Sequence, residues 1–188
     1  MKATVLTVFA ALLLCSTTVP SADLAEPLAA SRAAAQAFGA QLRGALQQAL
    51  HAGGPVNGIT VCHEEAARIA ATITQATGLQ VGRTSLKVRN PKNSPDEWEL
   101  LVLRDFEMRK AVGAAPDTLE FYEVVVQGGQ STFRYMKAIP TSQLCLACHG
   151  DNITPDVRAR LQPLYPSDAA YGFQEGDLRG AFTIARPL

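Results

Sequence analysis

The sequence has few aromatic residues, few cysteines and no excess of either charge. Its 188 residues include 17 basic and 17 acidic side chains, so the formal net charge is zero. Because no block of lysines and arginines stands out, nucleic acid and anionic membrane surfaces are poor candidates for a partner. A long apolar run is also missing: the mostly apolar stretch 3–14 is shorter than the about 20 residues that span a bilayer.

Residues 1–22 have the layout of a secretory signal peptide. Lys2 precedes the apolar stretch, and a stretch of small and polar residues, 16–22, follows it. A basic start, a short apolar core and a small-residue cleavage region direct the export of a chain. We therefore expect a periplasmic protein without stable membrane insertion, in which residues 23–188 form one domain. An uncleaved membrane anchor is the alternative.

Loss of the signal peptide removes Cys15 and leaves three cysteines, an odd number for a framework of disulfides. Two of them lie in the motif Cys145-Leu146-Ala147-Cys148-His149. With this spacing, two thiols can add across the vinyl groups of one haem, and the histidine can bind the iron below the ring. We therefore predict one covalent haem c, with Cys145 and Cys148 as thioether anchors and His149 as the proximal axial ligand.

Two other uses of the Cys-x-x-Cys spacing compete with this interpretation. A thioredoxin-type disulfide sits at the start of a helix in a βαβ context, and no such pattern surrounds the motif. Zinc would take Cys145, Cys148 and His149 together with Cys62 as four tetrahedral ligands. However, the adjacent Cys148 and His149 rarely reach one metal ion without strain.

The periodicity of apolar residues predicts both helices and strands, with two helices first and most of the strands in the second half of the chain. We expect helices at 24–51 (closed by Gly53-Gly54-Pro55), 59–76, 95–110 and 154–162, and strands at 81–89, 121–127, 132–138 and 180–185. Gly128 to Ser131 are typical of a hairpin turn. This order predicts an α+β domain, with the haem motif in a loop between strands.

Two of these elements carry residues that bear on the site. In the helix at 59–76, Cys62 falls on the apolar face and His63 near its edge. On the strand at 81–89, Arg83, Lys87 and Arg89 alternate on one face. These cations suit haem propionates, although a solvated strand face is an equal alternative. In the helix at 95–110, we expect a cap at Ser94 or Asp96 and an inward face of Trp98, Leu101, Val102 and Phe106.

Several further blocks occur in one order along the mature chain. They are Val61-Cys62, Gly82-Arg83-Thr84-Ser85-Leu86-Lys87-Val88-Arg89-Asn90-Pro91 with Asn93 and Pro95, Cys145 to Gly150, Tyr165-Pro166 with Asp168, Ala170 and Gly172, and Gly176-Asp177-Leu178-Arg179-Gly180-Ala181. In these blocks the chain resembles a family of small c-type haem domains of PAS-like fold. Members occur as free-standing exported proteins and as sensing modules of bacterial membrane receptors.

The resemblance implies a PAS-like antiparallel sheet flanked by helices, with a long N-terminal helix. It also implies that His149 and Cys62 hold the iron from opposite sides, because such proteins use the motif histidine and an upstream cysteine. From the residues alone, Cys62 is as well explained as a small buried hydrophobe. His63, Met136, Met108 or an open position would then supply the other side.

We expect redox or ligand (gas) sensing from this combination, with electron transfer by a periplasmic cytochrome c as the alternative. An enzyme is not expected, since two protein ligands leave no open position for a substrate. The partner would be a redox or signalling protein, which the sequence does not identify.

Covalent attachment has a direct test. Protein matured in a cell equipped for cytochrome c assembly should keep its colour after extraction with acidified acetone, because thioether links survive this treatment. A Cys145→Ala/Cys148→Ala variant is the control and should release any pigment. A colourless chain, or pigment in the acetone phase, would contradict the prediction; absorption spectra of both fractions make the measurement.

Overall fold

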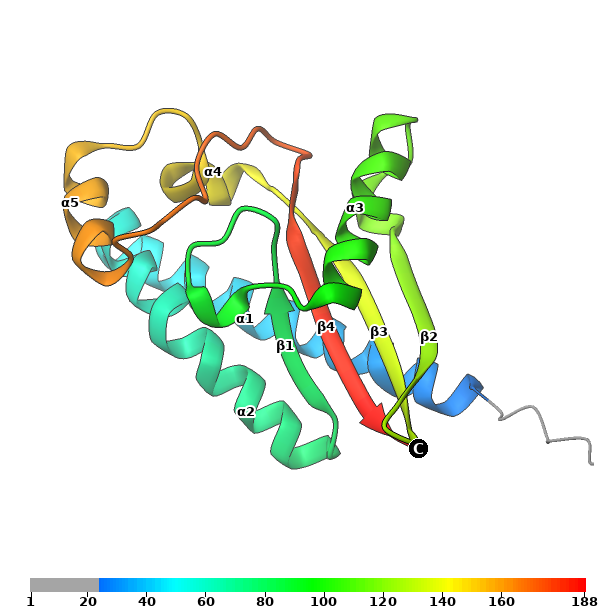
Figure 1. Cartoon of the computed structure of the whole chain (residues 1–188). Coiled ribbons are helices and arrows are strands. Elements are labelled where there is room, and N and C mark those ends of the chain that lie inside the picture. The colour runs from blue at the N-terminus through cyan, green and yellow to red at the C-terminus, as the bar shows by residue number, and fades with distance from the viewer. Residues whose placement is uncertain (1–23) are drawn as a thin grey trace, which may run out of the picture.

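An antiparallel sheet lies between helices on its two faces in the computed structural model, which describes residues 24–188 (Figure 1). The expected signal peptide, residues 1–22, lies outside the described part. In the described part the strands follow the order β1-β4-β3-β2. Their bounds are β1 (Gln80–Thr84), β2 (Glu120–Gln127), β3 (Gln130–Pro140) and β4 (Leu178–Pro187).

The helices account for most of the remaining chain. They are α1 (Ala25–Thr60), a π-helical turn (Val61–Glu65), α2 (Ala66–Thr77), α3 (Glu97–Ala111), α4 (Gln143–His149) and α5 (Pro155–Leu164). None of the helices within residues 24–188 combines the length and the hydropathy that a bilayer-spanning helix requires. The predicted α+β class, with an antiparallel sheet flanked by helices and a long N-terminal helix, is confirmed.

Alternating side chains of β3 and β4 serve two separate apolar cores. Phe133, Tyr135 and Ile184 pack against α1 and α2 on one face of the sheet. Met136 and Ala138 pack against α3 on the other face. Because successive residues of a strand point to opposite faces, both central strands are covered by helices on both sides. They form a rigid base for the loops and helices at the end of the sheet.

The N-terminal helix breaks where the sequence predicts. At Gly53 and Gly54 the backbone leaves the helical region, with φ of −166° and 68°. The segments on either side of the break pack together, since a Cβ added at Gly58 would lie 3.0 Å from the side chain of Leu46. The second segment begins at Pro55, earlier than the expected residue 59, because proline suits the first turn of a helix.

Two further predictions are confirmed, and one is wrong in detail. Asp96 caps α3 in a reciprocal capping box with Glu99. Gly128 and Gly129 form the turn of the β2–β3 hairpin, both with positive φ. The expected inward face of α3 fails at Leu101, which is 65 % exposed, because Leu103 fills the core instead.

The strand expected at 81–89 ends at Thr84, where β1 stops pairing with β4. Beyond this point the chain is held by side-chain contacts: the Ser85 hydroxyl donates to the Arg179 carbonyl oxygen at 2.7 Å. The haem motif also differs from expectation, because it forms the short helix α4 and not a loop.

Gly180 is required where β4 passes the end of β1. A Cβ at this position would lie 2.3 Å from the Thr84 carbonyl oxygen. Gly180→Ala should therefore lower the free energy of unfolding by about 1–3 kcal/mol. Gly44→Ala is the matched control: an added Cβ there meets nothing within 4 Å, and alanine in a helix should raise stability by about 0.5–1 kcal/mol. Urea unfolding midpoints measure both changes, and equal midpoints would contradict the close approach.

Candidate functional site

A cavity of about 910 Å³ opens between α1, the π-helical turn, the end of the sheet and α4. This volume falls in the range of about 300–1,000 Å³ that is usual for ligand and cofactor sites. Its lining includes the three motif residues Cys145, Cys148 and His149 from α4, and also Cys62 from the π-helical turn. The structure thus brings together the residues that the sequence and the resemblance predict for the iron and the thioether links.

The His149 ring is fixed by the backbone opposite α4. Its Nδ1 atom lies 2.9 Å from the Ala170 carbonyl oxygen, which can only accept, so Nδ1 carries the proton. The lone pair of the neutral ring is then on Nε2, the atom suited to a metal. Burial, and then the charges of Arg179 and Arg89, hold the pKa of His149 well below its usual value. The ring is therefore neutral, as a metal ligand must be.

The segment after α5 also holds the backbone of the motif. The Phe173 amide donates to the His149 carbonyl oxygen at 3.0 Å, and the Gly172 amide donates to the Gly150 carbonyl oxygen at 3.3 Å. The Phe173 ring meets the His149 ring edge to face, with centroids 6.1 Å apart. Backbone and ring contacts together fix both the position and the tilt of the imidazole.

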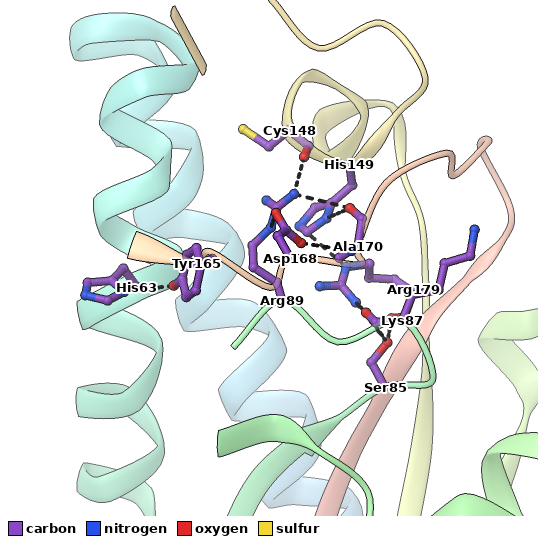
Figure 2. A network of polar contacts seen from close by, with 10 residues as sticks. All are labelled: His63, Ser85, Lys87, Arg89, Cys148, His149, Tyr165, Asp168, Ala170 and Arg179. Carbon is purple, nitrogen blue, oxygen red and sulfur yellow. Dashed lines mark hydrogen bonds and ion pairs between the residues drawn. The ribbon is translucent and has the colours of Figure 1, made fainter. Parts of the chain in front are cut away.

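A buried ion pair joins this segment to the loop after β1 (Figure 2). Arg89 Nε donates to Asp168 at 2.7 Å, and the two side chains are only 7 % and 3 % exposed. Arg89 Nη2 donates to the Cys148 carbonyl oxygen at 2.6 Å and to the Ala170 carbonyl oxygen at 3.2 Å. One guanidinium therefore supports both the motif helix and the acceptor of His149.

This arrangement corrects the prediction that Arg83, Lys87 and Arg89 share a strand face. Because β1 ends at Thr84, only Arg83 lies on a strand. Lys87 donates to the Tyr171 carbonyl oxygen at 3.1 Å, away from the cavity wall. Arg89 also lines the cavity but directs Nε and Nη2 to groups of the protein itself, so its contact with a propionate stays a prediction. Arg83 does line the cavity.

Arg179, which sequence reasoning did not single out, lies at the centre of the site. Its Nε donates to His149 Nε2 at 3.4 Å, and its Nη1 donates to the Ser85 hydroxyl at 3.0 Å (Figure 2). Burial and the neighbouring arginines lower the pKa of Arg179 to about 10. Only its place in the block Gly176 to Ala181 distinguishes it in the sequence, because no local pattern links it to His149.

Cys62 faces the cavity from the π-helical turn. Such turns are rare and occur often at functional sites, because the inserted residue changes the direction of the side chains around it. Burial raises the pKa of the Cys62 thiol, while the charges of Arg83, Arg179 and Arg89 act in the opposite direction. The partly buried thiol therefore lies near three cations, whose charges favour the thiolate while burial opposes it.

The competing ligands lie elsewhere. His63 directs Nδ1 to the Tyr165 hydroxyl at 2.8 Å and points away from His149 (Figure 2). Met136 is fully buried in the core under α3, and Met108 is 63 % exposed on α3. Among the described residues, none of these three contributes to the cavity wall. Within the same part of the chain, no group of three or more His, Cys, Asp and Glu side chains is arranged to hold a metal ion.

The Arg89–Asp168 pair allows a stability test. Asp168→Asn should lower the free energy of unfolding by about 3–5 kcal/mol, because it leaves the Arg89 charge buried without compensation. Glu65→Gln is the control, since it breaks the exposed pair with Arg68 and should cause no measurable change. Both are measured by urea unfolding of the haem-free chain. Similar stability of the two variants would contradict the role of the buried pair.

Comparison with known proteins agrees with this site. Residues 22–187 match the model of the Tll0287-like family, described as Tll0287. The crystal structure of the cyanobacterial haem protein Tll0287 is similar, with 26 % sequence identity and a TM-score of 0.63, covering 90 % of this chain and 97 % of that chain. No curated protein matches. Because the family model spans almost the whole sequence, this chain belongs to the Tll0287-like family.

Proposed function

We propose that this chain is an exported haem protein that holds one haem c and acts in redox or ligand sensing. Haem binding is supported by membership of a family whose solved relative is a haem protein. The observation that carries the proposal further is the shared cavity. Cys62 comes from the first half of the chain and Cys145, Cys148 and His149 from the second, yet all four line one cavity.

The residues present suit the group. Cys145 and Cys148 would form the thioether links, and the neutral His149 would offer Nε2 because Ala170 holds the proton on Nδ1. The Cys148 sulfur faces the backbone of Pro55, with 3.9 Å between the sulfur and the carbonyl oxygen, so the anchor lies beside the break in α1. When bound, an iron porphyrin supplies one-electron redox chemistry at this position.

Cys62 is the proposed ligand on the other side. As a thiolate bound to the iron it would favour the ferric state and lower the reduction potential. Burial favours the protonated thiol, so reduction, which removes positive charge from the site, would shift Cys62 toward protonation and release. A vacated position would admit a small gas molecule. Release of Cys62 on reduction would distinguish a sensor from a plain electron carrier.

Export and partners follow the same proposal. The layout of residues 1–22 supports periplasmic delivery, where haem is attached covalently. With no catalytic position left in the resting state, the chain would act on a separate redox or signalling protein and not as an enzyme. Electron transfer without a sensory role is the alternative, and it requires that both ligands stay bound in the two oxidation states.

Replacement of Cys62 tests the ligand set. Cys62→Ser should abolish the thiolate features of the electron paramagnetic resonance and absorption spectra. It should also raise the reduction potential, with each tenfold shift of the ferric–ferrous equilibrium equal to about 59 mV. His63→Gln is the control and should leave both unchanged. Unchanged spectra in Cys62→Ser would contradict thiolate ligation.

Ligand release has its own measurement. The ferrous protein should take up carbon monoxide, seen as a change in its absorption spectrum, while the ferric protein keeps Cys62 bound. Cys62→Ser should take up carbon monoxide faster, because its sixth position is already weakly held. Retention of both protein ligands in the ferrous state, without uptake, would favour electron transfer.

A further inference from the structure

Five arginines line the cavity, and two of them, Arg32 and Arg89, have a carboxylate partner. Of the other three, Arg43 is exposed to water, while Arg83 and Arg179 are partly buried. Within residues 24–188, no carboxylate lies within ion-pairing distance of Arg83 or Arg179. The site therefore holds two partly buried positive charges that the described part of the protein does not neutralise.

Arg83 has little polar contact of any kind. Its guanidinium lies over the Phe38 ring, 5.6 Å from the ring centroid. In the described part of the chain it makes no hydrogen bond, and burial lowers its pKa. A guanidinium carries five donors in a planar fork, and leaving them unused in a partly buried position costs free energy.

Arg179 has only neutral partners. Its Nε uses the His149 Nε2 lone pair, and its Nη1 uses the Ser85 hydroxyl and, at 3.4 Å, the Lys87 carbonyl oxygen. The contact with His149 cannot persist when a metal ion binds Nε2, because the lone pair can serve only one of them. Filling the site therefore frees the Nε donor of Arg179.

The rest of the chain treats its arginines differently. Five others form ion pairs with carboxylates: Arg32, Arg68, Arg109, Arg134 and Arg186. Four more arginines also lack a carboxylate partner, but they are exposed, so water solvates their charges: Arg43, Arg104, Arg158 and Arg160. Among the arginines of residues 24–188, partial burial without a carboxylate is thus confined to Arg83 and Arg179.

We propose that Arg83 and Arg179 form a carboxylate-binding subsite that takes the two propionate groups of the porphyrin. The inference rests on the proposed function and specifies it. It assigns this task to Arg179 in place of Arg89 and leaves Arg89 as the support of the motif. Two carboxylates would neutralise the two excess charges, and each matches the fork of a guanidinium.

The subsite can be tested without iron or thioether links. The probes are metal-free protoporphyrin IX, which carries both carboxylates, and its dimethyl ester, which carries none. Their fluorescence reports binding to the full haem-free chain, prepared without cytochrome c assembly. We expect the acid to bind at least tenfold more tightly than the ester. The ratio of the two affinities should fall to near unity in the double variant Arg83→Gln/Arg179→Gln. In Arg179→Gln alone it should fall by a factor of about three or more.

Arg104→Gln is the matched control, since it removes the same charge from the exposed face of α3, and it should keep the full preference. Arg179→Lys should retain part of it, because the charge stays and the fork is lost. Thermal unfolding shows whether each variant folds. If Arg179→Gln does not fold, the affinity ratio of Arg83→Gln tests the subsite instead.

The outcomes separate the two proposals. Equal binding of acid and ester to the unmodified chain would overturn the subsite while leaving a porphyrin cavity. An equal loss of preference in Arg104→Gln would also overturn it. Failure of both porphyrins to bind would contradict the porphyrin site itself and with it the proposed function.

Discussion

The buried ion pair between Arg89 and Asp168 is the interaction on which the site depends. It joins the loop after β1 to the segment after α5, and its remaining donors reach the carbonyl oxygens of Cys148 and Ala170. Two desolvated charges are tolerated only when their hydrogen bonds are complete. The Ala170 carbonyl oxygen also accepts a hydrogen bond from His149. One network of hydrogen bonds therefore supports the buried ion pair and fixes the orientation of the imidazole.

Local chemistry made part of this structure predictable from the sequence. The cap at Asp96, the break at Gly53-Gly54-Pro55 and the Gly128-Gly129 turn each rest on residues a few positions apart. The haem motif is likewise a local prediction, since it rests on the spacing of five neighbouring residues, and its role stays a prediction. The pairing of Cys62 with this motif in one cavity came from the resemblance, because a thiol on an apolar helix face is otherwise ambiguous.

The remainder could not be predicted because it depends on contacts between distant segments. β1 ends at Thr84 where the Ser85 hydroxyl finds the Arg179 carbonyl oxygen, almost a hundred positions away in the chain. A similar separation in sequence lies between Arg179 and the two residues to which its side chain donates, Ser85 and Lys87. No period or spacing encodes such pairs. For this reason Arg89 was expected to face a ligand, when Asp168 holds it inside the protein.

The position of β4 in the sheet has a consequence for the order in which the molecule is completed. This strand lies between β1 and β3, but it is synthesised after the haem motif. Until residues 178–187 are in place, β1 has no partner and the wall that carries Arg179 is missing, so the cavity stays open on that side. Such long-range closure is slow compared with helix formation. Closure of this side of the cavity therefore depends on the last strand of the chain.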